Sequence, residues 1–371
     1  MKLRLIIVIV VLSVSCEKPY LNLDGTQIIQ IDKSLNSKIQ LDEIELIRLE
    51  DNPFSQIVIL EEVIHSEQGF FINDKTATNT IFLYDESGKY QHHINRKGEG
   101  PGEYRGIKGI VWNEDLKELT LIPMDLNKEL KFDIHGNYLN ERKTNQNIIF
   151  SDFVDFGDDR LVFNISRMNH EDNVMLLKGE DIENKWLPYS DELDNTPVLT
   201  NKAMCRIDEK VLFAINARDS IYQYDNETQN VSAKYFIDFG SKKVDLSLEQ
   251  KLSDHEFFKY ITNEDVYFGI DFLYQADDFL SFTTMSSGGF VVFFYNTAKG
   301  ILHSSEKLLN DKLENGKLDR IVGVSRDGRF IGLLDTKDIK NIKEIQSIKK
   351  NFDSFRNIDR EDKVLVLFSL K

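Results

Sequence analysis

The chain has 371 residues, of which 41% are hydrophobic, and this is enough to bury the core of one large domain or of two smaller ones. Lys and Arg number 46 against 62 Asp and Glu, so the formal net charge is −16. The acidic residues are dispersed along the chain and leave no broad basic surface, which excludes nucleic acid as a partner.

The N-terminus has the pattern of an export signal. Lys2 and Arg4 precede an apolar run at 5–12, and small residues precede Cys16. The run is too short to span a bilayer, which takes about 20 residues. The pattern predicts a signal peptide at 1–15, then the lipid-attachment site Cys16 and a linker over 16–40. Leu12 lies four residues before the cysteine, whereas the lipoprotein pattern has Leu three residues before it, so an incidental thiol beside an ordinary cleavage site is the alternative.

Cys205 is the one cysteine left after such processing. No disulfide within the chain is then possible, and core burial must hold the fold together. Because this cysteine lies in the apolar sequence 203–207, we predict a small buried side chain rather than a nucleophile.

From residue 41 onward, short runs rich in Ile, Val, Phe, Tyr and Leu are separated by Asp, Asn and Gly, which is the pattern of β-strands. An apolar strand that ends in a turn recurs six times, with these equivalent positions: Tyr84, Phe132, Leu177, Tyr224, Tyr295 and Phe368. The intervals are 48, 45, 47, 71 and 73 residues. A period in the high forties with four strands per unit is typical of propellers. We therefore predict an all-β, six-bladed β-propeller as a single domain over 41–371.

Each unit divides into four strands, named a to d from the centre of the ring outwards. In the second unit we expect strand a near 107–112, b near 118–122, c near 130–132 and d near 137–142. The sixth unit ends after its strand c, while an unassigned strand at 43–49 precedes the first unit. This N-terminal strand is predicted to close the last blade and to cover its open edge.

Two short helical insertions are expected in the two long intervals. One is predicted over 247–260, capped by Ser247. The other has apolar residues every three or four positions among lysines, namely Ile339, Ile342, Ile345, Ile348 and Phe352. The connections from d to the next a, and from b to c, emerge on the same face of a propeller. Both insertions and the crossover 96–104 should therefore lie on that face, and elaborated loops are where function concentrates.

The sequence Gly-Glu-Gly-Pro-Gly-Glu-Tyr at 98–104 follows a first blade with Tyr-Asp-Glu-Ser-Gly-Lys at 84–89. These motifs resemble the six-bladed β-propeller lipoproteins of Bacteroidota, in which a Gly-x-Gly-Pro-Gly-Glu-Tyr segment follows a Tyr/Phe-Asp-x-x-Gly-Lys turn. The resemblance covers essentially the whole mature chain and extends in architecture to NHL-type propellers. It implies a fold and a location in the cell envelope, as an outer-membrane lipoprotein facing the periplasm or the surface. It implies no established reaction.

The segment 98–104 also supplies candidate binding residues. Its glycines allow positive φ and close approach of the backbone, and no Gly-Lys-Ser/Thr follows that would make a phosphate loop. We expect Arg96, Glu99, Glu103 and Tyr104 on the binding face, with the last two at the channel mouth. The alternative is structural, with Glu103 accepting backbone N–H bonds from the turn and Tyr104 packing between blades.

No catalytic constellation is evident. The sequence has no Gly-x-Ser-x-Gly and no His-Glu-x-x-His, and its seven histidines are scattered. Propeller lactonases and related hydrolases hold Ca²⁺ in the central channel with acidic and amide side chains of the innermost strands. The weak metal candidates here are Asp152, Asp208 and Asp271. Apart from this calcium option, no cofactor is expected.

Three functions are compatible with these observations. We predict a monomeric, non-catalytic, lipid-anchored envelope module that presents its elaborated face to a glycan, peptide or protein partner. A calcium-dependent propeller hydrolase or lactonase is the first alternative, and a structural accessory of an outer-membrane complex is the second. The tripeptide Asp219-Ser220-Ile221 also matches the Asp-Ser/Thr-apolar pattern of O-glycosylation in exported Bacteroidota proteins.

Overall fold

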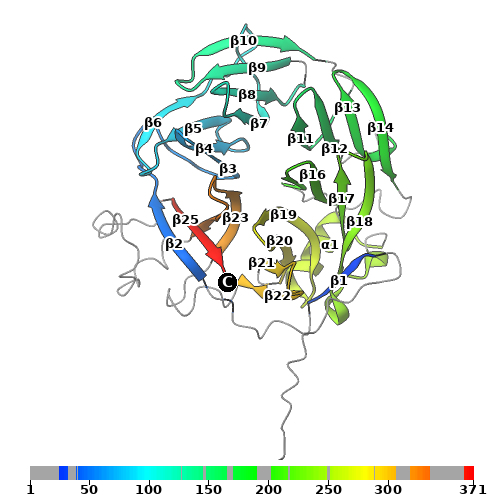
Figure 1. Ribbon diagram of the computed structural model, residues 1–371. Coiled ribbons are helices and arrows are strands. Elements are labelled where there is room, and N and C mark those ends of the chain that lie inside the picture. Colours follow the sequence, from blue (N-terminus) through cyan, green and yellow to red (C-terminus); the bar gives the residue numbers. More distant parts are fainter. Residues whose placement is uncertain are drawn as a thin grey trace, which may run out of the picture.

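Short apolar runs bounded by turn residues form strands, and these assemble into antiparallel sheets of four strands, which are consecutive along the chain in every blade but the last. Six such sheets stand around a common axis as the blades of a propeller (Figure 1). The predicted all-β, six-bladed propeller is confirmed. Each equivalent position identified in the sequence lies on the third strand of its blade and is buried: Tyr84, Phe132, Leu177, Tyr224, Tyr295 and Phe368.

This computed structural model describes residues 25–31, 39, 41–126, 128–144, 148–164, 170–189, 202–215, 218–248, 251–287, 289–305, 318–334 and 363–371. Cys16 and the helix predicted around Ile339 lie outside the described residues. None of the helices in the described part is both long enough and apolar enough to cross a membrane.

The blades follow one another along the chain. Blade 1 is β3 (Glu62–Ser66), β4 (Gly69–Asp74), β5 (Thr80–Tyr84) and β6 (Tyr90–Ile94). Blade 2 is β7 (Ile107–Asn113), β8 (Glu118–Pro123), β9 (Lys128–Asp133) and β10 (Tyr138–Lys143). Blade 3 is β11 (Asp152–Phe156), β12 (Asp159–Phe163), β13 (Asp172–Lys178) and β14 (Asp181–Pro188). Blade 4 is β15 (Met204–Ile207), β16 (Lys210–Ala214), β17 (Ser220–Asp225) and β18 (Asn230–Asp238). Blade 5 is β19 (Phe268–Ala276), β20 (Phe279–Ser286), β21 (Gly289–Asn296) and β22 (Ile301–Ser304). Blade 6 is β23 (Leu318–Val324), β24 (Phe330–Leu334), β25 (Val364–Leu370) and the N-terminal β2 (Leu41–Arg48).

The N-terminal strand closes the ring as predicted. β2 pairs antiparallel with β25, with Leu46 opposite Val366, so the last blade draws its outermost strand from the other end of the chain (Figure 1). A further strand, β1 (Gln27–Gln30), adds to the outer edge of blade 4 and runs parallel to β18. The sequence analysis did not anticipate β1, because four residues with only two isoleucines are too short to give a strand pattern.

The core lies between neighbouring blades. At the junction of blades 5 and 6, the ring centroid of Phe294 is 5.3 Å from that of Phe330 and 5.9 Å from that of Phe368. All three side chains are buried, and burying one such ring stabilises the fold by about 1.5–3 kcal/mol. Among the described residues the cysteine, Cys205, is a free thiol, so packing of this kind rather than a disulfide joins the described blades.

The helix predicted over 247–260 begins later and ends later, as α1 (Asp254–Asn263). Ser253 caps it and forms a capping box with Glu256, which satisfies the free N–H groups of the first turn. The predicted start instead holds a short 3-10 helix (Leu246–Leu248), where Asp245 accepts from the Ser247 N–H. Another 3-10 helix spans Gly240–Lys242. Phe257 anchors α1 on the propeller, with its ring centroid 5.6 Å from that of Phe268.

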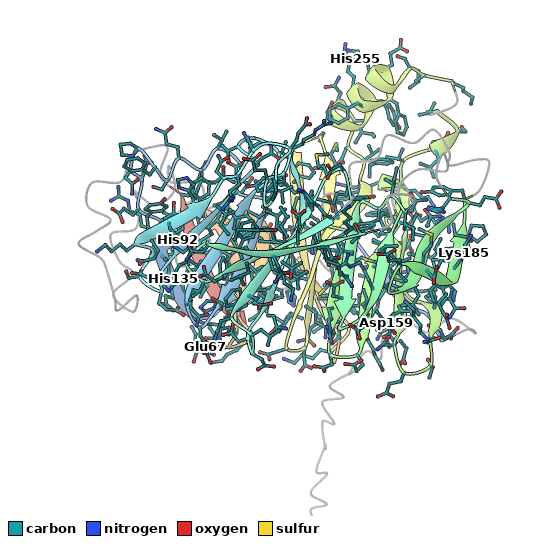
Figure 2. The ribbon with its side chains drawn as sticks, turned by 90° about the horizontal axis from the view of Figure 1, so that it is seen from above. Glu67, His92, His135, Asp159, Lys185 and His255 are labelled. Carbon is teal, nitrogen blue, oxygen red and sulfur yellow. The ribbon has the colours of Figure 1, made fainter. Side chains whose placement is uncertain are left out.

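The two faces of the ring differ in their loops. We call the face formed by the d-to-a and b-to-c connections the crossover face. α1 lies in the crossover from blade 4 to blade 5, and Figure 2 shows it with His255 on one side of the ring, whereas Glu67 and Asp159, at a-to-b turns, lie on the other. The predicted placement of this insertion is therefore consistent with the structure.

Candidate functional site

The crossover face carries most of the exposed apolar side chains. Ten large apolar side chains are exposed in the described part of the chain. Six lie in or beside connections of this face: Phe54, Val58, Met124, Ile149, Phe258 and Phe290. The others lie at the opposite face (Leu116 and Ile301) or on the fourth strands of blades 2 and 4 (Leu139 and Phe236). The six come from five different connections around the ring, so this face offers several separate apolar groups.

The Gly-Pro-Gly-Glu turn of this face is held by its own side chains. Glu103 Oε2 accepts a hydrogen bond from the Gly100 N–H at 2.9 Å. A Cβ atom on Gly98 would lie 2.0 Å from the same oxygen, so a larger residue there would displace the Glu103 side chain from the turn. Tyr104 is 1% exposed, and its hydroxyl lies 3.0 Å from the Asn79 carbonyl oxygen and 3.1 Å from that of Ile94. This is the structural alternative considered above, and Tyr104 offers no surface to a ligand.

Arg96 and Glu99 are the candidates from this segment that stay exposed. The Arg96 guanidinium stands 5.6 Å from the centroid of the Tyr138 ring. Glu99 Oε1 is 2.5 Å from Arg105 Nη2. The two side chains engage different partners, so the structure does not bring the four predicted residues together as one site.

Charged side chains converge instead near the axis, where the innermost strands begin. Glu62 is the first residue of β3, Asp152 is the first of β11, and Lys202 precedes β15. Lys202 Nζ is 3.1 Å from Glu62 Oε1 and 3.5 Å from Asp152 Oδ1. Blades 1 and 4 are opposite in a ring of six, so this lysine connects opposite sides of the propeller. Asp271 binds the Lys202 N–H, and Lys75, Lys108 and Tyr274 are coupled to these groups through their charges or pKa values. We call the whole group the axial cluster: Glu62, Lys75, Lys108, Asp152, Lys202, Asp271 and Tyr274.

Two aspartates hold the backbone that presents Lys202. Asp271 Oδ1 accepts from the Lys202 N–H at 2.9 Å, and Asp152 Oδ2 accepts from the Met204 N–H at 2.9 Å. Phe272, beside Asp271, has φ of 50°, in the left-handed region that non-glycine residues rarely adopt. The pairing register of β19 shifts on both sides of Asp271. The backbone is thus bent where it meets Lys202, and such strain is found more often at functional sites than elsewhere.

The ion pairs keep these groups charged. Burial alone raises the pKa of Glu62, but the charges of Lys202 and Lys75 outweigh it and hold that pKa below its ordinary value. Burial alone lowers the pKa of Lys202, but Asp152 and Glu62 raise it well above its ordinary value. The carboxylate and ammonium forms are both favoured at neutral pH.

Three polar groups of the axial cluster lack such partners. Lys75 follows β4 and Lys108 is the second residue of β7, and neither forms an ion pair or hydrogen bond with a described residue. Burial, and next the charge of Lys75, lower the pKa of Lys108. Tyr274 is 7% exposed, and its hydroxyl has no hydrogen-bond partner in the described structure. Burial, and next the charge of Glu62, raise the Tyr274 pKa well above its ordinary value.

The metal candidates are not brought together. Asp152 and Asp271 both meet the segment at Lys202, but Asp208 lies in the a-to-b turn of blade 4, on the opposite face. Among the described residues, no group of three or more His, Cys, Asp or Glu side chains is arranged to hold a metal ion. The Lys202 ammonium supplies positive charge between Glu62 and Asp152, where a calcium ion would otherwise do so.

Cys205 is 7% exposed, and burial raises the pKa of its thiol to about 11. These features fit the predicted small buried side chain and not an activated nucleophile. At the tripeptide Asp219-Ser220-Ile221, the serine begins β17 and is half-buried, and the isoleucine is fully buried. Its glycosylation stays a prediction.

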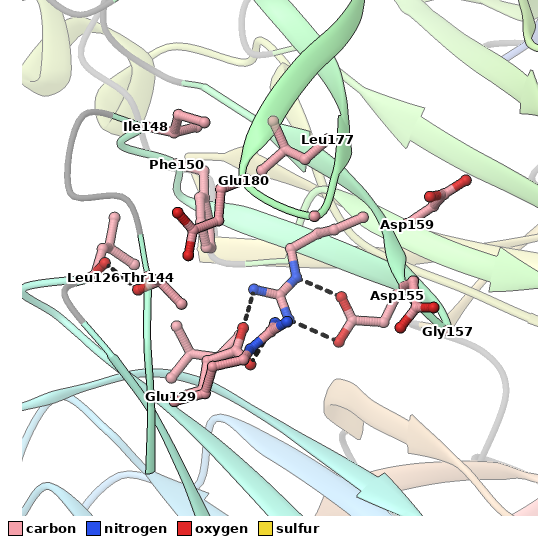
Figure 3. Close-up of a pocket in the computed structure, with 15 residues that line it drawn as sticks. Leu126, Glu129, Thr144, Ile148, Phe150, Asp155, Gly157, Asp159, Leu177 and Glu180 are labelled. Carbon is pink, nitrogen blue, oxygen red and sulfur yellow. Dashed lines mark hydrogen bonds and ion pairs between the residues drawn. The ribbon is translucent and has the colours of Figure 1, made fainter.

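A cavity between blades 2 and 3 is occupied by an ion-pair network (Figure 3). Arg160 binds both carboxylate oxygens of Asp155, and its Nη1 lies 2.8 Å from Glu129 Oε1. Glu129 also binds Arg142 at 2.9 Å. The cavity holds about 50 Å³, far below the roughly 300 Å³ of a small-molecule pocket. This network joins two blades and is not a ligand site.

A larger depression of about 470 Å³ lies between blades 4 and 5. Half of its lining residues carry amide or lysine side chains, namely Gln27, Lys210, Gln223, Lys234 and Gln275. No acidic cluster or nucleophile is among its described lining residues, so it suggests no reaction.

The sequence analysis missed the lysines of the axial cluster. The only site considered near the axis was a calcium site. Calcium ligands are oxygen atoms, so acidic residues of the inner strands were chosen and Lys75, Lys108 and Lys202 were not. One signal was available: Lys202 immediately precedes the apolar sequence 203–207, which contains the innermost strand β15 (Met204–Ile207). The unpaired hydroxyl of Tyr274 could not be foreseen, because it depends on the bend in β19.

The sequence profile of the family described as Domain of unknown function (DUF4934) matches residues 22–368. Among solved structures, a "Putative exported protein" from Bacteroides fragilis NCTC 9343 is 15% identical, with a TM-score of 0.73 over 93% of this chain and 100% of its own. A member of the duf4221 family from Bacteroides vulgatus ATCC 8482 is 9% identical, with a TM-score of 0.55 over 90% and 99% of the two chains. These likenesses show a shared fold. No curated protein is significantly similar in sequence.

Proposed function

We propose, from the premise that this chain belongs to the DUF4934 family, that it is an exported binding module whose crossover face holds an apolar peptide segment of a partner. The module acts by binding and carries out no reaction of its own. The observation that carries this proposal is the distribution of exposed large apolar side chains: of the ten in the described residues, six lie on one face.

The chemistry of that face favours a peptide over a glycan. Val58, Met124 and Ile149 are aliphatic or thioether side chains in three different connections. They offer apolar area and no hydrogen-bonding groups, which suits the side chains of a peptide better than the hydroxyl groups of a sugar. Phe54 and Phe258 add aromatic area of the kind that dominates binding at protein interfaces.

The proposed location is the cell envelope, with Cys16 as the lipid anchor. The charged N-terminus and short apolar run support export, and the related Bacteroides fragilis structure is itself described as a "Putative exported protein". Labelled palmitate should enter the intact protein and not a Cys16→Ser variant. Equal labelling of the two proteins would exclude this anchor.

The binding proposal is tested with an immobilised library of hexapeptides rich in Leu and Phe. The variant F54S/V58S/F258S removes apolar area from the crossover face, and L116S/I301S serves as a matched control on the opposite face. We expect the immobilised peptides to retain at least about tenfold less of the first variant than of the control, since each large apolar side chain contributes about 1 kcal/mol or more. Equal retention by the two variants would overturn the proposal.

A further inference from the structure

The depression between blades 4 and 5 has the size of a ligand site. Its volume of about 470 Å³ lies within the range of roughly 300–1,000 Å³ that small-molecule pockets occupy. Among its lining residues, Ile207 ends β15, Lys210 begins β16 and Gln275 is the last but one residue of β19. The depression therefore opens at the a-to-b turns of both blades, on the face opposite the crossover face.

The additional strand β1 forms one wall of this depression. β1 runs parallel to β18 at the outer edge of blade 4 (Figure 1), and Gln27 lies opposite Tyr235 in this pairing. Both residues line the depression, and so does Gly25, two residues before Gln27. Within the described structure, blade 4 is the one sheet with a fifth strand. That strand encloses a space that a blade of four strands would leave open.

Several polar side chains of the depression have unused hydrogen-bonding groups. The amides of Gln27 and Gln223, the ammonium group of Lys234 and the hydroxyl of Tyr235 form no hydrogen bond or ion pair with a described residue. β18 separates the strands of Gln27 and Gln223, so these two residues are about 10 Å apart across the sheet. The unused groups therefore suit a ligand with several polar groups along its length.

The chemistry of these groups suits a ligand rich in hydroxyl groups. A hydroxyl both donates and accepts a hydrogen bond, and a glutamine amide offers two N–H donors and a carbonyl acceptor. One amide can therefore bind a pair of hydroxyl groups on neighbouring carbon atoms. Ile207, which is half-buried, adds apolar area that the C–H groups of such a ligand can cover.

Other ligand classes fit less well. Lys210 Nζ lies 3.6 Å from Asp225 Oδ2, which leaves Lys234 as the one lysine of the described lining without an ion-pair partner. A phosphate group brings up to two negative charges, more than one exposed and screened lysine can neutralise. Leu212 and Tyr235 are buried, so the lining offers little apolar area to the side chains of an apolar peptide.

We propose that this depression binds a saccharide. Gln27 and Gln223 form the main hydrogen bonds to its hydroxyl groups, and Lys234 and the Tyr235 hydroxyl contribute further ones. The site does not rest on the peptide-binding function proposed above, because it lies on the other face of the ring. The protein then has two binding sites of different chemistry, one on each face.

An array of immobilised neutral and uronic-acid oligosaccharides tests the saccharide site. The variant Q27A/Q223A removes both unused amides, and Q56A/Q91A is the matched control, because these two glutamines are not part of the depression. We expect the array to retain about tenfold less of Q27A/Q223A than of the control, since each neutral hydrogen bond changes affinity about threefold or more. If no oligosaccharide retains the protein, or if both variants are retained equally, the proposal is wrong.

A second variant shows whether the loss reflects binding or folding. Gln223→Glu keeps the size of the side chain but replaces its N–H donors by a carboxylate oxygen. We expect this variant to keep the thermal transition of the unsubstituted protein and to lose array binding. Unchanged array binding by folded Gln223→Glu and by folded Q27A/Q223A would overturn the proposal.

The saccharide site and the peptide-binding face can fail separately. The variant F54S/V58S/F258S should bind the oligosaccharide array like the unsubstituted protein, and a loss there would place the saccharide on the crossover face and overturn this site. Q27A/Q223A should in turn leave retention by the hexapeptide library unchanged. If it lowers that retention instead, the depression binds the peptide and the saccharide proposal is wrong.

Discussion

The ammonium group of Lys202 lies 3.1 Å from the carboxylate of Glu62, on the opposite side of the ring. Their side chains are 23% and 20% exposed, so the pair is shielded from most of the solvent. Among the described residues, the extensive strand contacts between blades join neighbours around the ring. This ion pair crosses the axis and ties the crossover from blade 3 to blade 4 to the start of blade 1.

Replacing Lys202 by Met should destabilise the protein by about 2 kcal/mol. The methionine keeps most of the apolar stem but leaves Glu62 and Asp152 without their counter-charge. The expected cost lies between about 0–1 kcal/mol for an exposed pair and about 3–5 kcal/mol for a buried one. Urea unfolding measures it, and the double variant with Glu62→Gln should lose less than the sum of the single changes. Strict additivity would mean that the two side chains do not interact.

The same pair predicts how stability depends on pH. The pKa of Glu62 is lowered in the folded state, so its contribution is fully present above its ordinary value of 4.5 and is lost as pH falls through the folded value. The pKa of Lys202 is raised, so its contribution is present below its ordinary value of 10.5 and is lost as pH rises through the folded value. The stability difference between the unsubstituted protein and Glu62→Gln should therefore be largest between these limits and shrink on acidification. A difference that is constant from neutral pH down to about pH 3 would contradict this account.

Calcium should stabilise a Lys202→Ala variant more than the unsubstituted protein. Removing the ammonium leaves the oxygen atoms of Glu62 and Asp152 available to a hard cation. Stabilisation would be about 1.4 kcal/mol at a free calcium concentration roughly tenfold above Kd. Thermal unfolding with and without calcium gives the readout, and Lys185→Ala is the matched control. If calcium stabilises the unsubstituted protein to the same degree, the calcium-dependent alternative gains support over the binding module.

The ring could be predicted because each blade repeats a buried third strand. Tyr84, Tyr224 and Tyr295 are large side chains that pack between blades, and the need to fill that space imposes the period that the sequence displays. Closure by β2 was predictable because blade 6 has an unpaired edge and the N-terminal strand has no partner in blade 1. Pairing the two satisfies the backbone hydrogen-bonding groups of both.

The candidate site could be predicted only in part. Asp152 and Asp271 were identified because acidic residues on inner strands are candidate calcium ligands. Their observed roles depend on Lys202, which comes from a different part of the chain. Contacts across the axis join residues far apart in sequence and leave no local pattern. The Gly-rich motif at 98–104 differs: it is easy to recognise in the sequence, but it serves the fold rather than a site. Glu103 binds the turn, and Tyr104 packs and bonds within the fold.

Removing β2 should abolish the cooperative fold, whereas removing β1 should not. A chain that begins at residue 50 leaves β25 with an unpaired edge and uncovers the core between blades 6 and 1. A chain that begins at residue 39 loses only the short parallel strand on blade 4. We expect aggregation and loss of a sharp thermal transition for the first and a folded protein for the second. A folded, monomeric chain beginning at residue 50 would show that closure is not needed for stability.

Tyr104→Phe should lower the free energy of unfolding by about 1–2 kcal/mol, because the carbonyl groups of Asn79 and Ile94 lose their buried hydrogen-bond donor. Arg96→Gln and Glu99→Gln are exposed changes in the same segment and should alter stability by less than about 0.5 kcal/mol. Urea unfolding compares the three. The peptide retention of folded Tyr104→Phe should equal that of the unsubstituted protein, since this ring does not reach the surface. Reduced retention at unchanged stability would instead return Tyr104 to the binding face, because a purely structural hydroxyl cannot affect binding without affecting the fold.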